Sequence, residues 1–270
     1  MAEIATGTED LLAERRGGIL ILTMNRPDRR NALSKEMLGA MAAQLEEAEL
    51  DPEVRVVVLT GAGGAFCAGG DVKGMAEGAG QDVPIDVRIH RQRLSQRATS
   101  GRLHTMPKPT IAAIPGPAAG AGLSLALACD MRVMADNAIM TTAFAKVGFA
   151  GDYGGTWFLS QLVGSAKAKE MYFLSDRIDA ADADRLGLAN RVVPGDTLMS
   201  ETLALAERLE KGAPLAYRYM KENLNRAIGG EVMECMDLEV THHTHTGLSE
   251  DHRNATRAFV EKRPPVFTGK

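Results

Sequence analysis

The 270-residue sequence predicts an α/β core over residues 1–195, followed by a helical region over residues 196–270. In the first part, short runs of β-branched and apolar residues alternate with stretches of helical periodicity. Beyond about residue 195 strand-like runs almost disappear, and glycines separate four helix-like stretches. Apolar residues make up 45% and charged residues 24% of the chain, the proportions of an ordinary globular domain, which argues against a disordered or fibrous protein.

The predicted core begins with a strand over residues 19–25 (ILILTMN). Residues 31–49 then predict an amphipathic helix, whose apolar stripe consists of Leu33, Met37, Leu38, Met41 and Leu45. Three apolar runs without polar alternation predict strands buried on both faces, at residues 55–60, 110–114 and 131–134. A long polar helix is expected over residues 85–106, and strands separated by helices indicate βαβ units.

The helical region is predicted to contain helices over residues 197–211, 214–228, 231–245 and 249–262. Helices that project from a core often pack on neighbouring subunits, so we expect a homo-oligomer. The stretch THHTHT (241–246) offers three histidines, but their spacing does not place all of them on one helical face. We therefore expect no metal site.

Net charge, the cysteine pattern and the length of the apolar runs argue against several classes of protein. The 31 Lys and Arg and 35 Asp and Glu give a net charge of −4, which argues against a nucleic-acid-binding protein. The three cysteines fit no zinc pattern, and Cys67 and Cys129 are expected as buried free thiols in a reducing, cytoplasmic setting. The N-terminal residues do not resemble a signal peptide, and the apolar run 123–129 is too short to span a membrane.

Two glycine-rich segments each follow a predicted buried strand: 61–75 (GAGGAFCAGGDVKGM) and 115–124 (PGPAAGAGLS). The second leads into a buried helix, so its amides would lie at the positive end of a helix dipole. Two amides from separate loops that converge on one point form an oxyanion hole. From the residues alone, glycines that serve only tight turns are an equal alternative. The sequence lacks the P-loop pattern, and no dinucleotide-binding pattern directly follows the first strand.

Four motifs resemble the enoyl-CoA hydratase/isomerase family, also called the crotonase family: NRPDRRNALS (25–34), AFCAGGDVK (65–73), PGPAAGAGL (115–123) and AFVEKRPPVF (258–267). The resemblance extends over nearly the whole chain. It implies a crotonase-like spiral of ββα units with a helical C-terminal trimerisation region. It also implies a homotrimer or a dimer of trimers that binds acyl-CoA thioesters, with no metal or redox cofactor and with coenzyme A as part of the substrate.

The resemblance assigns site residues position by position. The two oxyanion amides fall on Gly70 and on Ala121, which replaces the middle glycine of the usual triplet. Losing one such donor typically costs about 2.7–4 kcal/mol of transition-state stabilisation. The CoA-binding positions are Arg30, Asp71, Val72, Lys73, Phe259 and Lys262. The last two often act across a subunit boundary in the family, and positive side chains suit the phosphates of CoA.

The sequence departs from the family's hydratases where these carry two water-activating glutamates. Those positions hold Ser124 and Phe144, neither of which serves as a general base at neutral pH. Asp152 falls instead where double-bond isomerases of the family carry an aspartate base. Burial among Phe144, Phe149, Tyr153 and Trp157 would raise its pKa by desolvation of the charged form.

These positions favour a double-bond isomerase that uses Asp152 as base and the two amides as oxyanion hole. A structural alternative for Asp152 is the N-cap of a helix over residues 154–163. Three alternatives for the whole protein remain: a 2-enoyl-CoA hydratase despite the missing glutamates, a dehalogenase or thioester hydrolase acting through Asp152, and a non-catalytic acyl-CoA-binding homologue.

Overall fold

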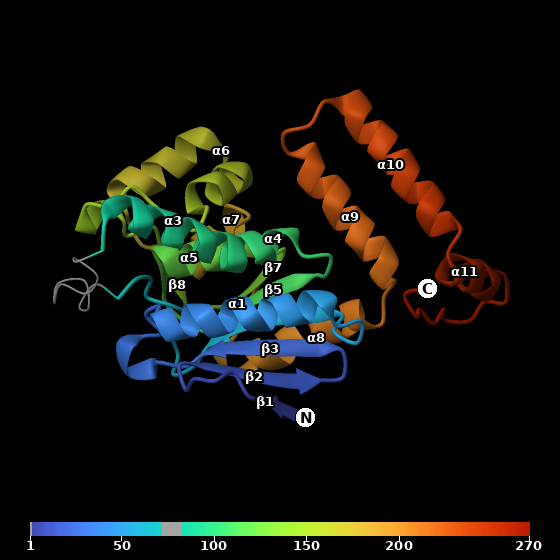
Figure 1. Cartoon of the computed structure of the whole chain (residues 1–270), viewed down its shortest axis with the longest axis horizontal. Helices are drawn as coiled ribbons and strands as arrows, with labels where there is room; N and C mark the ends of the chain where they lie inside the picture. The colour runs from blue at the N-terminus through green and yellow to red at the C-terminus, as the bar shows by residue number, and fades with distance from the viewer. Residues whose placement is uncertain (1, 72–82) are drawn as a thin grey trace.

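A computed structural model describes residues 2–71 and 83–270 (Figure 1). Its main sheet has the strand order β1-β2-β3-β4-β5-β7-β10. The strands are β1 (Ala2–Ile4), β2 (Leu11–Arg16), β3 (Ile19–Met24), β4 (Val56–Gly61), β5 (Thr110–Ile114), β7 (Met131–Ala135) and β10 (Arg191–Val193). Those from β3 onward pair in parallel, whereas β1 and β2 are antiparallel.

The sequence predictions for β3, β4, β5 and β7 are confirmed to within a residue or two. All of β5, and all of β4 except its last residue, is buried, as expected for apolar runs without alternation. The polar hairpin of β1 and β2 was not predicted. A small second sheet, of β6 (Ala118–Ala119), β8 (Ile139–Thr141) and β9 (Ile178–Asp179), also escaped prediction, because such short strands carry no periodic signal.

The first helix, α1 (Lys35–Leu50), begins four residues later than predicted. Its N-cap is Ser34, whose hydroxyl accepts a hydrogen bond of 3.0 Å from the Met37 amide. The residues before it are not helical, because Asn31 has a left-handed φ of 57° and the Leu33 amide donates to the Gly69 carbonyl at 2.8 Å. The start of the predicted helix therefore pairs with the first glycine-rich loop.

The predicted long polar helix is present as α3 (Ile85–Gln96), a π-helical turn η2 (Arg97–Gly101) and α4 (Arg102–Thr105). Every residue of α5 (Ala121–Ala128) is buried, which explains why its sequence is apolar apart from Ser124. The next helix, α6 (Gly155–Leu174), is interrupted at Gly164, which has φ 76° and ψ 161°. A short helix, α7 (Ala180–Arg185), follows β9.

The four predicted C-terminal helices are confirmed as α8 (Leu198–Glu210), α9 (Pro214–Ala227), α10 (Val232–Gly247) and α11 (Glu250–Val260). The apolar side of α8, with buried Leu198, Leu205 and Ala206, packs on the main sheet. By contrast, α9, α10 and α11 project to one side of the core (Figure 1). The division of the chain into a core and a helical region at residue 195 stays a prediction. In the structure α8, which follows residue 195, packs on the main sheet as a layer of the core.

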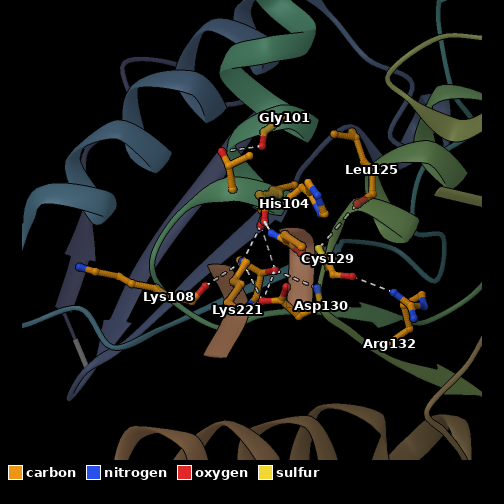
Figure 2. Close-up of polar contacts among 12 residues, drawn as sticks. Gly101, His104, Lys108, Leu125, Cys129, Asp130, Arg132 and Lys221 are labelled. Carbon is orange, nitrogen blue, oxygen red and sulfur yellow. Dashed lines mark hydrogen bonds and ion pairs between the residues drawn. The ribbon is translucent and has the colours of Figure 1, made fainter. Parts of the chain in front are cut away.

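A buried ion pair fastens α9 to the core (Figure 2). The Lys221 ammonium donates to Asp130 Oδ2 at 2.8 Å and to the carbonyls of Leu103 and Lys108 at 3.0 Å each. Asp130 also accepts hydrogen bonds from the amide and hydroxyl of Thr110. Every donor of this ammonium therefore has a partner, as a buried charge requires.

The predictions for the thiols are confirmed: Cys67 and Cys129 are free and buried. Burial raises the pKa of each thiol to about 12, so both stay protonated at neutral pH. Among the described helices, none is both long enough and apolar enough to cross a bilayer.

Candidate active site

The two glycine-rich loops lie side by side, joined by main-chain hydrogen bonds. The amides of Phe66 and Cys67 donate to the Pro117 carbonyl at 3.1 Å each, and the Ala119 amide donates to the Cys67 carbonyl at 2.9 Å. A β-carbon on Gly122 would lie 2.4 Å from the Cys67 carbonyl oxygen. Glycine is therefore required where α5 meets the first loop.

This pairing brings the amides of Gly70 and Ala121 to the same place. A β-carbon on Gly69, whose φ is +93°, would lie 3.4 Å from the Ala121 nitrogen. Ala121 is the first residue of α5, so its amide has no intrahelical acceptor. Neither the Gly70 nor the Ala121 amide donates a hydrogen bond to another described residue. Two free amides and a helix N-terminus can together stabilise a negatively charged oxygen.

A cavity of about 470 Å³ contains all three predicted catalytic residues, Gly70, Ala121 and Asp152. Arg26, Asp71 and Tyr153 also line it. The three come from separate segments: the loop after β4, the N-terminus of α5 and the loop before α6. The structure thus places a carboxyl group and two free amides around one space.

Asp152 is a carboxylate without full hydrogen bonding. Its Oδ1 is buried and has no hydrogen-bond partner among the described residues. Burial raises the pKa of Asp152 from 3.8 to about 6. The N-cap alternative is wrong: Gly154 occupies the cap position, with no side-chain cap, and only the main-chain carbonyl of Asp152 accepts from the Gly155 amide, at 3.1 Å. Unsatisfied buried polar atoms with perturbed pKa values are typical of functional sites.

The prediction of which aromatic residues bury Asp152 is only partly correct. Tyr153 is buried and lines the cavity, whereas Phe149 and Trp157 are 55% and 41% exposed. Trp157 instead makes an edge contact with His104, at 5.2 Å between ring centroids, in a separate apolar pocket. The aromatic group next to the Asp152 loop is Tyr172, which sequence reasoning missed. It comes from the far end of α6, beyond the reach of a local pattern.

One arginine of the first motif lines the cavity, and it is not the arginine assigned by the resemblance, whose role in CoA binding stays a prediction. Arg30 is exposed and does not line the cavity, whereas Arg26 does. The Arg26 guanidinium lies 3.3 Å from Asp71 and 3.5 Å from Asp10, and it donates to the Ala32 carbonyl at 2.6 Å. Asp71 lines the cavity, and its role in CoA binding stays a prediction. The ion pair between Arg26 and Asp71 therefore holds Gly70, the neighbour of Asp71, close to the loop after β3. The signal for Arg26 was its position directly after the first predicted strand.

Of the remaining CoA positions, Phe259 and Lys262 do not line the cavity within one chain. Val72 and Lys73 lie outside the described residues. Phe259, near the end of α11, is 85% exposed, and Lys262 is exposed just beyond that helix. Figure 1 shows α11 on the other side of the molecule from α3, and Gln92 of α3 lines the cavity.

Several known proteins are similar to this chain over nearly its whole length. The family model described as Enoyl-CoA hydratase/isomerase matches residues 14–270. The 1,2-epoxyphenylacetyl-CoA isomerase of Escherichia coli is 35% identical, covering 97% of this chain and 99% of that protein. The short-chain-enoyl-CoA hydratase of Clostridium acetobutylicum is 33% identical, covering 94% of this chain and 95% of that protein.

A crystal structure of an enoyl-CoA hydratase from Polaromonas sp. JS666 superposes with a TM-score of 0.89 and 35% identity. The match covers 95% of this chain and 99% of the Polaromonas chain. The predicted crotonase-like α/β fold is therefore confirmed. A family match over most of the chain and relatives at this identity lead to one conclusion: the chain belongs to the enoyl-CoA hydratase/isomerase family of acyl-CoA enzymes.

Proposed function

We propose that this chain is an enoyl-CoA isomerase, which moves a carbon–carbon double bond along the acyl chain of a CoA thioester. One observation carries the proposal: the Asp152 carboxyl group, with a pKa of about 6, shares a cavity with the free amides of Gly70 and Ala121. A base and an oxyanion hole in one space are what an allylic proton shift needs.

The geometry supports a simple sequence of proton transfers. The thioester oxygen accepts hydrogen bonds from the two amides, and Asp152 takes a proton from an acidified carbon of the acyl chain. The electron pair of that C–H bond enters the dienolate, and the negative charge reaches the thioester oxygen. Asp152 then returns the proton to another carbon of the dienolate. A carboxyl group with a pKa of about 6 is ionised at neutral pH, yet its conjugate acid still donates readily.

The two positions at which the family's hydratases carry glutamates favour isomerisation over hydration. The Ser124 hydroxyl donates to the Gly120 carbonyl at 3.3 Å, and the buried Phe144 ring stacks on Tyr172. The relatives' names do not decide between the reactions, since the E. coli protein is named an isomerase and the Clostridium protein a hydratase.

The test is a panel of enoyl-CoA thioesters of different acyl structure, incubated with the protein in deuterated water. An isomerase incorporates deuterium into the acyl chain and shifts the double bond without adding oxygen. A hydratase produces the 3-hydroxyacyl thioester, which ¹⁸O-labelled water reveals. A binding homologue shows thioester binding by calorimetry but neither reaction, and that result would overturn the proposal. Asp152→Asn must abolish deuterium incorporation while the protein remains folded.

For the assembly, we propose a homotrimer or a dimer of trimers in which the projecting helices contact neighbouring subunits. Support comes from large apolar side chains that these helices expose, among them Met220, Leu224, Met236, Val240 and Phe259. Exposed apolar surface of this kind is typical of protein interfaces. Sedimentation equilibrium should give three or six times the chain mass of 28.9 kDa. Thioester binding by Phe259→Asp and Lys262→Ala then tests the CoA role of these positions.

A further inference from the structure

Tyr172 lies against the Asp152 loop because α6 turns back on itself at Gly164. Figure 1 shows α6 as two helical segments. A β-carbon on Gly151 would lie 3.1 Å from the Tyr172 ring, and one on Gly155 would lie 2.7 Å from its hydroxyl. The phenol therefore packs against both ends of the short loop that carries Asp152, and glycine at each end leaves room for it.

The Tyr172 hydroxyl also begins a chain of hydrogen bonds that ends at the oxyanion hole. It hydrogen-bonds the Ser124 side chain beside Gly155, where a β-carbon would lie 2.2 Å from the Ser124 hydroxyl and 2.7 Å from that of Tyr172. The Ser124 hydroxyl also donates to the Gly120 carbonyl at 3.3 Å. The Gly120 carbonyl and the Ala121 amide belong to the same peptide unit. A hydrogen bond accepted at that carbonyl polarises the unit and strengthens the amide as a donor.

This peptide unit follows a backbone conformation that requires glycine. Gly120 has φ 53° and ψ −127°, a conformation that L-residues rarely adopt. The ring of Tyr172 is itself fixed by Phe144, at 5.8 Å between ring centroids and 8° between planes. Burial, and secondarily the charge of Asp152, raises the pKa of the phenol, which therefore stays protonated at neutral pH. Both positions that hold glutamates in the family's hydratases, 124 and 144, thus contact one tyrosine here.

We infer that Tyr172 is a positioning residue that sets the Asp152 carboxyl group against the Ala121 amide. It acts through Ser124 on the Gly120–Ala121 peptide unit, and through Gly151 and Gly155 on the Asp152 loop. The inference rests on the proposed isomerase function. Its physical basis is that base and oxyanion donor must keep one geometry while a proton moves, and displacements of about 1 Å can cost about a hundredfold in rate.

The experiment compares Tyr172→Phe, Ser124→Ala and the double variant with the parent. Tyr172→Phe keeps the ring and its contact with Phe144 and removes only the hydroxyl. Each single change should lower kcat for deuterium incorporation about tenfold or more, with KM within about twofold. The double variant should lose little more than the worse single variant, because both changes break the same chain. Tyr219→Phe, on α9, is the matched control and should behave like the parent.

Amide hydrogen exchange gives a second measurement that does not depend on turnover. The segment 148–158 should exchange faster in Tyr172→Phe and Ser124→Ala than in the parent, and at the parent's rate in Tyr219→Phe. A parent-like kcat in Tyr172→Phe, losses that multiply in the double variant, or unchanged amide exchange would overturn the inference. If the parent incorporates no deuterium from any thioester, the proposed function fails, and the amide exchange alone decides on Tyr172.

Discussion

Two aspartates in this protein, Asp130 and Asp152, have opposite surroundings. Asp130 accepts hydrogen bonds from the Lys221 ammonium at 2.8 Å and from the Thr110 amide and hydroxyl, at 2.8 and 3.1 Å. Asp152 has a buried Oδ1 without a partner among the described residues, and burial raises its pKa to about 6. Asp130 serves the attachment of α9, whereas Asp152 faces the cavity with the two free amides.

The two aspartates show that a polar side chain inside the protein can serve either the stability of the fold or the chemistry of a site. A carboxylate that is paired with a buried ammonium and accepts hydrogen bonds from the protein serves to hold two segments together. A carboxylate left short of partners costs stability, but it can accept a proton from a substrate. The same Asp→Asn substitution should therefore have opposite consequences at the two positions.

The largest expected effect is that of Asp152→Asn on turnover. Removing the base should reduce deuterium incorporation into an enoyl-CoA thioester by a factor of about 10²–10⁴. The unfolding free energy at pH 7 should not fall, because an amide does not incur the desolvation of a buried charge. Rates come from NMR and stability from urea denaturation. Parent-level incorporation would remove Asp152 from the mechanism.

The second prediction concerns Ala121→Pro, which removes the main-chain hydrogen-bond donor of residue 121 from the same cavity. Proline fits the first position of a helix but has no amide hydrogen. The variant should lose about 2.7–4 kcal/mol of transition-state stabilisation, a fall in kcat/KM of about 10²–10³. The control, Ala121→Gly, retains the amide and should keep most of the activity. If both variants lose activity equally, the amide has no special role.

Asp130→Asn should act on stability rather than on chemistry. It leaves the buried Lys221 ammonium without its counter-charge, at an expected cost of about 3 kcal/mol in unfolding free energy. The kcat of the folded fraction should stay within about twofold of the parent's. Adding Lys221→Met should recover part of the lost stability, and a double-mutant cycle in urea measures this. A stability loss in Asp130→Asn that Lys221→Met does not reduce would contradict the assigned role.

The smallest effect is the pH dependence that Asp152 contributes. Since its folded-state pKa of about 6 exceeds the ordinary 3.8, the folded protein binds more protons between these values. The unfolding free energy should therefore decline as pH rises from about 4 to 6, and this slope should be absent in Asp152→Asn. Turnover should fall about tenfold per unit below pH 6, where the base is protonated. A flat profile from pH 5 to 7 would contradict the pKa.

Prediction from the sequence succeeded where the signal was local. The strands β4 and β5 and the C-terminal helices were predicted because the burial of each element produces a regular pattern of apolar residues along the sequence. The resemblance named Gly70, Ala121 and Asp152, and the structure brings these three residues to one cavity, while their catalytic roles stay predictions. The short strands β6, β8 and β9 escaped, because two or three residues show no period.

The sequence by itself therefore determined the α/β class, the buried strands and the helical C-terminal part. Only the tertiary structure decided that Arg26 rather than Arg30 lines the cavity, that Trp157 belongs to a different pocket, and that Tyr172 returns beside Asp152. The physical reason is that a local pattern records how each segment is buried. Which distant segments meet depends on how loops pair and where α6 bends, at Gly164.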